Sequence, residues 1–162
     1  MAKGSWSPYL PEVTFCFLAF FINFFWEVLQ TYFYTLKSSA FDTMLYYWLH
    51  CTLGDVVISL GSFYFVSLAF RTRKWFLRLN RLNYFGFIVF GLVWTIISEW
   101  VNVYILKTWD YNGIMPVIPW IKVGLTPVLQ WMVIPSVVIL LVRHEFLLEK
   151  EVAKRGEERN DK

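Results

Sequence analysis

Hydrophobic residues gather in four long stretches that are separated by short polar segments. The stretches cover residues 12–34, 43–70, 84–106 and 123–142. Each is long enough for an α-helix to cross a bilayer, which takes roughly 20 residues at a rise of about 1.5 Å per residue. The pattern predicts an all-α integral membrane protein whose four spans pack as a helix bundle, with Pro11 at the start of the first span.

Two segments outside the spans differ in character. Residues 107–122 are rich in aromatic residues, glycine and proline, and they are too apolar for a loop that floats free in water. We expect this segment to fold back on the membrane surface as a lid between the third and fourth helices. Residues 143–162 are highly charged and predict a solvated helical tail, distinct from a membrane domain of residues 1–142. Pro127 and Pro135 predict kinks in the fourth span.

The distribution of basic residues indicates the orientation. Hydrophobic residues make up 57% of the chain and the mean hydropathy is +0.48, which fits a membrane protein. Of the 15 Lys and Arg residues, 12 lie on one side of the predicted spans. The other side holds only Lys37, Lys107 and Lys122. The positive-inside rule therefore places both termini in the cytoplasm and the aromatic loop outside. We expect a multi-pass protein of the bacterial inner membrane, with no nucleic-acid partner and no disulfide between Cys16 and Cys51.

Three carboxyl groups, those of Glu27, Asp55 and Glu99, lie inside three different predicted spans. A carboxylate at the centre of a bilayer costs about 3 kcal/mol on insertion scales, so such residues are by default candidates for function. Measured along ideal helices, all three, together with His50 and Gln130, fall in the outer half of the membrane. We therefore expect a polar pocket that opens toward the outer leaflet beneath the aromatic loop.

Helical phase supports one inward polar stripe on each helix. Asn23, Glu27 and Gln30 share a face at i, i+4 and i+7. A second stripe on the third helix consists of Thr95, Glu99 and Asn102. The plain alternative is that these groups only join helices through interhelical hydrogen bonds, each of about 0.6–2 kcal/mol. That alternative is most serious for the uncharged residues, because an acid is a costly way to make such a bond.

The first functional interpretation is acid–base chemistry on an isoprenoid or other lipid, as in a cyclase or isomerase. Desolvation in hydrocarbon favours the protonated form of a carboxyl group, which can then give its proton to an olefin or epoxide. Aromatic rings would stabilise the resulting cation. In this interpretation the candidate catalytic residues are Glu27, Asp55, Glu99 and His50, and no cofactor is needed. The candidate substrate-binding residues are Asn23, Trp26, Gln30, Trp100, Asn102, Gln130 and Trp131.

Two further interpretations remain open. Glu27, His50, Asp55 and Glu99 offer hard ligands for iron, manganese or zinc, but no Glu-x-x-His or His-x-x-x-His spacing is present and His144 lies beyond the last span. Alternatively, the chain is an accessory subunit or assembly factor of a larger membrane complex. Its basic inner loop and charged tail would then bind a protein partner or anionic lipid.

Several motifs carry a resemblance. They are Asn23-Phe-Phe-Trp26-Glu27, His50-Cys51-x-x-Gly54-Asp55, Ser98-Glu99-Trp100-x-Asn102, Trp109-x-Tyr111-x-x-x-Met115-Pro116 and Gly124-Leu125-x-Pro127-x-x-Gln130-Trp131. Together they resemble short bacterial four-span membrane proteins of uncharacterised function.

The Asn-x-x-Trp-Glu run is also similar to a motif of integral-membrane terpene cyclases, which have about seven spans. That resemblance implies a catalytic role for Glu27, with Asp55 as the counterpart of a distant catalytic Asp. The Trp-x-Tyr run at Trp109 is similar to membrane lycopene cyclases, although Gln130 stands where their paired acids are expected.

Cysteine labelling in intact cells tests the orientation. A Cys introduced at Asn112, in the aromatic loop, should react with a membrane-impermeant thiol reagent, because that loop is expected outside. A Cys introduced at Asn80, in the basic loop, should be protected until the cells are opened. The reverse pattern would refute the orientation.

Overall fold

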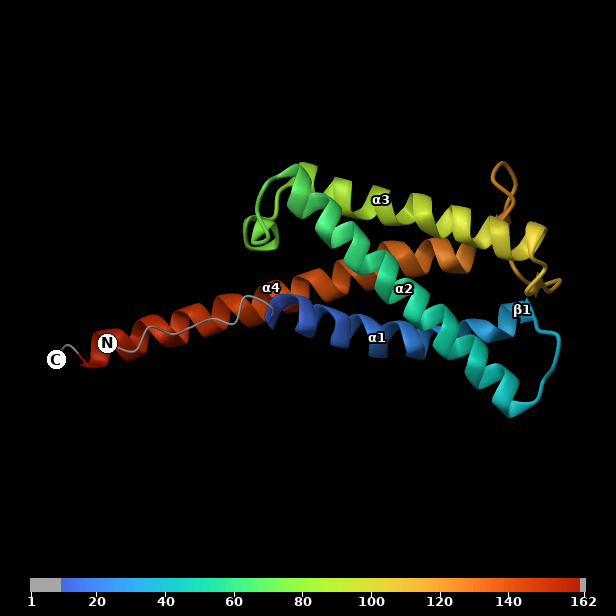
Figure 1. The fold of residues 1–162 in the computed structure, drawn as a ribbon, viewed down its shortest axis with the longest axis horizontal. Helices are drawn as coiled ribbons and strands as arrows, with labels where there is room; N and C mark the ends of the chain where they lie inside the picture. The colour runs from blue at the N-terminus through green and yellow to red at the C-terminus, as the bar shows by residue number, and fades with distance from the viewer. Residues whose placement is uncertain (1–9, 161–162) are drawn as a thin grey trace.

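The structure is a computed structural model that describes residues 10–160, and within this range four helices are long and apolar enough to cross a membrane. They are α1 (Leu10–Gln30), α2 (Phe41–Ala69), α3 (Arg81–Trp100) and α4 (Leu125–Asn160) (Figure 1). The predicted all-α architecture with four long apolar helices is confirmed. Lys3 and Lys162, two of the 12 basic residues counted on the expected cytoplasmic side, lie outside the described residues.

The helix ends differ in detail from the hydrophobic stretches. α1 is followed by a 3₁₀ turn, η1 (Thr31–Phe33), and α3 continues as a π-helix, η3 (Val101–Ile105). α4 does not stop where the apolar stretch stops at residue 142, because the charged segment that follows also favours a helix and extends it without a break. Pro127 falls in the first turn of α4, where its missing N–H costs no hydrogen bond, and Pro135 lies inside the helix.

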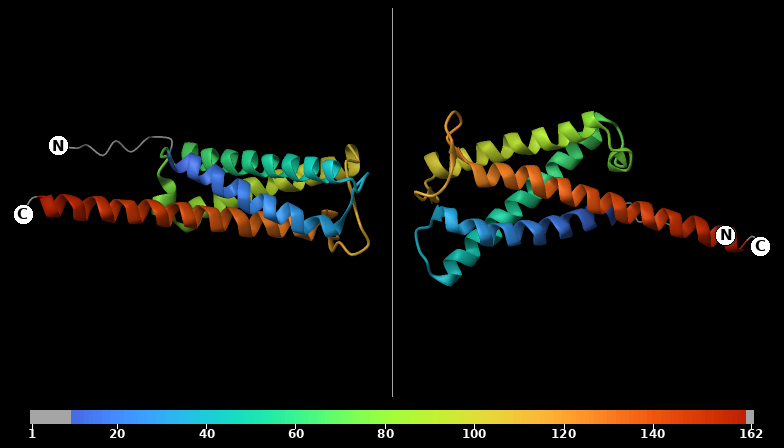
Figure 2. Two further views of the ribbon diagram at one scale, coloured as in Figure 1. Left: turned by 90° about the horizontal axis from the view of Figure 1, so that it is seen from below. Right: turned by 180° about the vertical axis from the view of Figure 1, so that it is seen from behind.

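Successive helices run antiparallel (Figures 1 and 2). α1 packs against α2 and α4, and α3 packs against the same two helices. The connection between α2 and α3 contains the 3₁₀ helix η2 (Trp75–Arg78), and it lies at the same end of the bundle as the beginning of α1. α3 then begins with a capping box, in which the Asn80 side chain accepts from the Asn83 backbone N–H and the Asn83 side chain accepts in return from the Asn80 backbone N–H.

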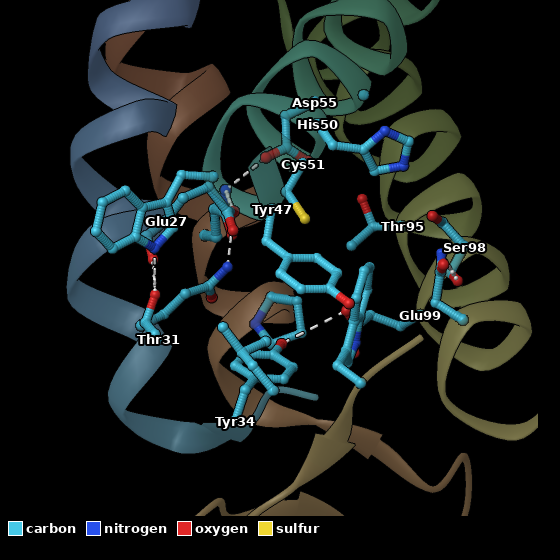
Figure 3. A pocket seen from close by; sticks show the side chains of 18 of the residues that line it. Glu27, Thr31, Tyr34, Tyr47, His50, Cys51, Asp55, Thr95, Ser98 and Glu99 are labelled. Atoms are coloured by element: carbon cyan, nitrogen blue, oxygen red, sulfur yellow. Dashed lines mark hydrogen bonds between the residues drawn. The ribbon is translucent and has the colours of Figure 1, made fainter. Parts of the chain in front are cut away.

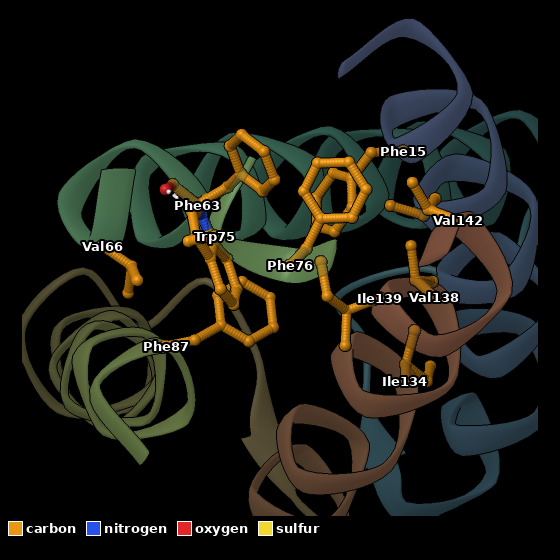
Figure 4. Close-up of a cluster of buried hydrophobic side chains, with 11 residues drawn as sticks. Phe15, Phe63, Val66, Trp75, Phe76, Phe87, Ile134, Val138, Ile139 and Val142 are labelled. Carbon is orange, nitrogen blue, oxygen red and sulfur yellow. Dashed lines mark hydrogen bonds between the residues drawn. The ribbon is translucent and has the colours of Figure 1, made fainter. Parts of the chain in front are cut away.

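The end of the bundle near η2 contains the hydrophobic core (Figure 4). Trp75 and Phe76 of η2 are buried against side chains from all four helices, including Phe15 and Phe87. The Trp75 indole also donates a hydrogen bond of 3.2 Å to the Phe63 carbonyl near the end of α2. Arg73 makes an ion pair of 2.6 Å with Glu12 at the start of α1. The connection between α2 and α3 thus closes this end of the bundle.

The outer faces of the helices are apolar. On α1, the residues at successive intervals of four are each more than half exposed: Val13, Phe17, Phe21, Phe25 and Leu29. A continuous exposed apolar stripe of this kind is typical of a surface that faces lipid or another protein. Together with the helix lengths, it indicates a multi-pass membrane protein.

Short strands form the opposite end. β1 (Tyr34–Thr35) pairs antiparallel with β2 (Asp110–Tyr111), which sets Tyr34 opposite Tyr111. β3 (Val117–Ile118) and β4 (Val123–Gly124) form a second antiparallel pair just before α4. The segment between α3 and α4 is therefore an ordered cap that is tied to the end of α1, and Trp120 at its outer edge is 91% exposed.

A close contact between α3 and α4 leads to a prediction for stability. A Cβ added at Gly91 would lie 1.5 Å from the buried Trp131 ring, whereas a Cβ at Gly86 meets only Val66 at 3.8 Å. Gly91→Ala should therefore lower the free energy of unfolding by about 1–3 kcal/mol through overpacking. Gly86→Ala should cause no loss, because alanine is favoured over glycine in a helix. Thermal unfolding in detergent measures both, and equal behaviour of the two variants would contradict this packing.

Candidate functional site

The half of the bundle beneath the cap contains a polar cavity of about 110 Å³. Side chains from all four helices and from the cap line it, and many of them are polar (Figure 3). Glu27 and Asp55 project from α1 and α2 on one side, and Thr95, Ser98 and Glu99 project from α3 on the other. The cavity thus collects the intramembrane acids of three helices.

The Gln130 amide is the centre of the hydrogen-bond network. Its Nε2 lies 2.7 Å from Asp55 Oδ2, 2.9 Å from Glu27 Oε1 and 3.0 Å from Asn23 Oδ1. One residue of α4 is thereby joined to two acceptors on α1 and one on α2. Because an amide nitrogen carries only two hydrogens, it cannot fully satisfy three acceptors at once.

The carboxyl groups of Glu27 and Asp55 lie close together, because both accept hydrogen bonds from Gln130 Nε2. Two buried carboxyl groups that lie this close repel each other when both are ionised, which favours a state in which one of them carries a proton. Glu27 Oε1 also accepts a hydrogen bond of 2.7 Å from the Gln30 side-chain amide. The side-chain oxygen of Gln30 in turn accepts a hydrogen bond of 3.0 Å from the Trp26 indole. The pair is therefore surrounded by neutral amide donors.

Glu99 belongs to a second group of hydrogen bonds on the other side of the cavity. The Tyr111 hydroxyl donates a hydrogen bond of 2.6 Å to Glu99 Oε2, and the Tyr34 hydroxyl donates one of 3.4 Å to Glu99 Oε1. The pairing of β1 with β2 brings these two tyrosines together. Burial, and secondarily the Glu99 carboxylate, raises the pKa of each tyrosine hydroxyl above its usual range, so both remain donors. Both oxygens of Glu99 thus accept hydrogen bonds from tyrosine hydroxyls.

Aromatic rings form much of the remaining wall. Trp109 of the cap is only 8% exposed and packs edge-on against Tyr34 and Tyr47. The Trp48 indole donates a hydrogen bond of 2.6 Å to the Thr31 hydroxyl, and this bond holds the ring beside the cavity. Trp48 and Trp109 therefore line the cavity.

Seven of the eleven residues named as site candidates from the sequence line the cavity. They are Glu27, Gln30, His50, Asp55, Glu99, Asn102 and Gln130. Asn23 and Trp26 do not line the cavity, but each is hydrogen-bonded to a residue that does. Asn23 bonds to Gln130, and Trp26 bonds to Gln30. His50 is exposed at the edge and stacks on Tyr46 at 5.7 Å.

The structure does not bring Trp100 and Trp131 to the cavity. Trp100 is 47% exposed and packs beside Tyr104, because its position on α3 points away from the Glu99 face. Trp131 is buried against Gly91 and donates 2.8 Å to the Ile88 carbonyl, so it joins α4 to α3. Asn102 lines the cavity, but its side chain bonds to the Ser98 carbonyl and to Thr108, which fastens the π-helix to the cap.

Tertiary structure adds residues that the sequence did not single out as site candidates. Tyr34, Tyr47 and Trp109 line the cavity, and Tyr111 bonds to Glu99 from the cap. Thr95 is 93% buried and its hydroxyl, which faces the cavity, has no hydrogen-bond partner among the described residues. The Trp109-x-Tyr111 motif already marked two of these residues in the sequence. That Tyr111 bonds to Glu99 becomes clear only from the pairing of β1 with β2.

The charges of the lining residues are unusual. Three carboxyl groups lie in the cavity, and among the described residues no Lys or Arg side chain lines it. Within residues 10–160 no group of three or more His, Cys, Asp or Glu side chains is placed to hold one metal ion. The arrangement is suited to holding and moving protons.

Comparison of the chain with protein-family models, with curated proteins and with solved structures finds no match.

The network distinguishes the roles of Glu27 and Gln130. In Glu27→Gln the new amide oxygen can accept from Gln30 and Gln130, and its NH₂ can donate to Asp55, so we expect the melting temperature to be kept or raised. Gln130→Leu removes the common donor and leaves buried acceptors unsatisfied, which should cost roughly 1–3 kcal/mol. Thermal unfolding in detergent compares the two. A loss of the fold in Glu27→Gln would show that the acid is structural.

Proposed function

We propose that the protein is a small membrane enzyme that transfers a proton to an isoprenoid or other lipid, in an isomerisation or cyclisation. The observation that carries the proposal is that the carboxyl groups of Glu27 and Asp55 are held by one Gln130 amide in a cavity with aromatic walls. The pair holds a proton, and the neutral amides around it fix the orientation of both carboxyl groups.

A balanced reaction uses the acids on both sides of the cavity. The pair of Glu27 and Asp55 gives its proton to one carbon of a substrate olefin, whose π electrons form the new C–H bond and leave a cation on the neighbouring carbon. The faces of Tyr47 and Trp109 stabilise that cation. Glu99 then accepts a proton from an adjacent carbon, and the electrons of that C–H bond form the new double bond. No oxidant, reductant or cofactor is consumed.

The orientation belongs to the same proposal. With the basic connection around η2 in the cytoplasm and the cap outside, the cavity lies in the outer half of a bacterial inner membrane. The described start of α1 and the extended part of α4 both lie at the η2 end, as a cytoplasmic location of both termini requires (Figure 2).

A second candidate function is that of a subunit or assembly factor. The observation that favours it is the extension of α4 well past the bundle, where exposed charged residues include the ion pair of Lys154 with Glu158 (Figure 2). A partner protein bound there should co-purify with the full chain and be lost when the chain is shortened after Glu149.

Deuterium incorporation tests the enzyme proposal. The full-length protein is reconstituted into liposomes made from an isoprenoid-containing lipid extract and incubated in D₂O. Protonation at carbon should give a lipid with one additional carbon-bound deuterium, detected by mass spectrometry. Glu27→Gln should lower the rate about 10²–10⁴-fold, the range of general acid catalysis.

Trp100→Phe is the control, because Trp100 lies outside the cavity, and its rate should equal that of the unaltered protein. Equal incorporation by the unaltered protein and Glu27→Gln, or none by either, would refute the proposed chemistry.

A further inference from the structure

The cavity reaches the surface of the bundle through the side of α2. His50 and Gly54 both line the cavity and both are exposed, one helical turn apart. They lie about 14 and 20 Å along α2 from Phe41, at about 1.5 Å per residue, so both are far from the ends of this 29-residue helix. An opening at that position faces the acyl chains of a bilayer, not the water on either side.

Gly54 leaves this opening free. A Cβ added there would meet no atom within 4 Å. Beside these two residues on α2, Leu53 and Val57 are apolar and more than half exposed. The surface beside the opening is therefore suited to a hydrocarbon chain, and the cavity behind it is suited to a polar group.

We propose that the cavity takes the uncharged, oxygen-bearing head of a long-chain lipid, such as an alcohol, which enters sideways from the bilayer between α2 and α3. This inference rests on the proposed function only in that both concern the same cavity. It names the chemical class of the substrate and its route, and it holds for binding whether or not a proton is transferred.

The charges in the cavity exclude an anionic head. A phosphate carries a charge of about −1.5 to −2 at neutral pH and is bound in proteins chiefly by Arg, Lys or backbone N–H groups. Three acids and, among the described residues, no Lys or Arg line this cavity. The acids already accept hydrogen bonds from the amides of Gln30 and Gln130 and from the hydroxyl of Tyr111, so a neutral head need not supply a charge to them. A cationic amine is the competing head group, and the experiment below compares it directly.

The Thr95 hydroxyl gives the cavity a free group that matches a neutral head. It is 93% buried, faces the cavity and has no partner among the described residues. A hydroxyl can both donate to and accept from a lipid alcohol. The volume of about 110 Å³ holds a head of a few atoms, since benzene alone occupies an engineered cavity of about 150 Å³. The chain of the lipid must then remain in the bilayer.

Photo-crosslinking tests both the route and the head group. The full-length protein in phosphatidylcholine liposomes is irradiated with a long-chain primary alcohol that carries a diazirine near the head and a terminal alkyne at the tail. Parallel samples contain the phosphate monoester and the primary amine with the same chain. Labelling by the alcohol should exceed labelling by either analogue at least tenfold, and excess unlabelled alcohol should suppress it.

Two leucine substitutions on α2 form a matched pair. Gly54→Leu should lower labelling by the alcohol at least fivefold, because the side chain fills the opening. Gly61→Leu should leave labelling within twofold, because Gly61 lies two turns further along the same exposed face, outside the cavity, where a Cβ meets only Phe90 at 4.0 Å. Thr95→Val should lower labelling, and Thr95→Ser should preserve it.

The outcomes separate the two proposals. Equal effects of Gly54→Leu and Gly61→Leu would overturn the side opening. Preferential labelling by the phosphate or the amine would overturn the neutral head. If labelling follows the expected pattern while no deuterium is incorporated, the lipid site stands and the enzyme proposal fails.

Discussion

A carboxyl group inside a membrane has no water to bind it, so its hydrogen-bond partners must come from neighbouring helices. In this protein the Gln130 amide supplies that partner for Glu27 and Asp55 together and also bonds to Asn23. The position of α4 relative to α1 and α2 is thereby tied to the position of the acids. Moving any of the three helices would leave a buried acceptor without its donor, which is why the polar network and the bundle geometry depend on each other.

The two halves of the bundle have different roles: one is a packed hydrophobic core and the other contains the polar cavity. Close packing of aromatic and aliphatic side chains around η2 fills one half, where the helices are held by shape and by the indole of Trp75. The other half is left incompletely filled, and hydrogen bonds between polar side chains take the place of packing. A cavity with fixed polar walls is possible there because the first half, together with the strand pairs of the cap, holds the helices in place.

The cap does more than cover the cavity. Its strand β2 delivers Tyr111 to Glu99, and the pairing with β1 sets Tyr34 on the same carboxyl group. Asn102, at the π-helical end of α3, is bonded to Thr108 at the start of the cap. π-Helical turns are frequent at functional sites, where the wider turn changes the direction of side chains. The cap, together with the strand that pairs with it, thus supplies hydrogen-bond partners to Glu99.

The sequence by itself determined the four spans, the polar stripes on the first and the third, and the expectation that the acids share one depth. Apolar runs of this length have few alternatives to spanning helices, and the helical period assigns Glu27 with Asn23 and Gln30, and Glu99 with Thr95 and Asn102, to single faces. Only the tertiary structure decided which stripes meet and which aromatic residues join them. Trp131 and Trp100 stand next to Gln130 and Glu99 in sequence, but adjacent residues on a helix point about 100° apart, so both tryptophans lie outside the cavity. Tyr34 and Tyr111 are 77 positions apart and meet only through strand register, a long-range pairing that no local pattern of hydrophobic and polar residues specifies.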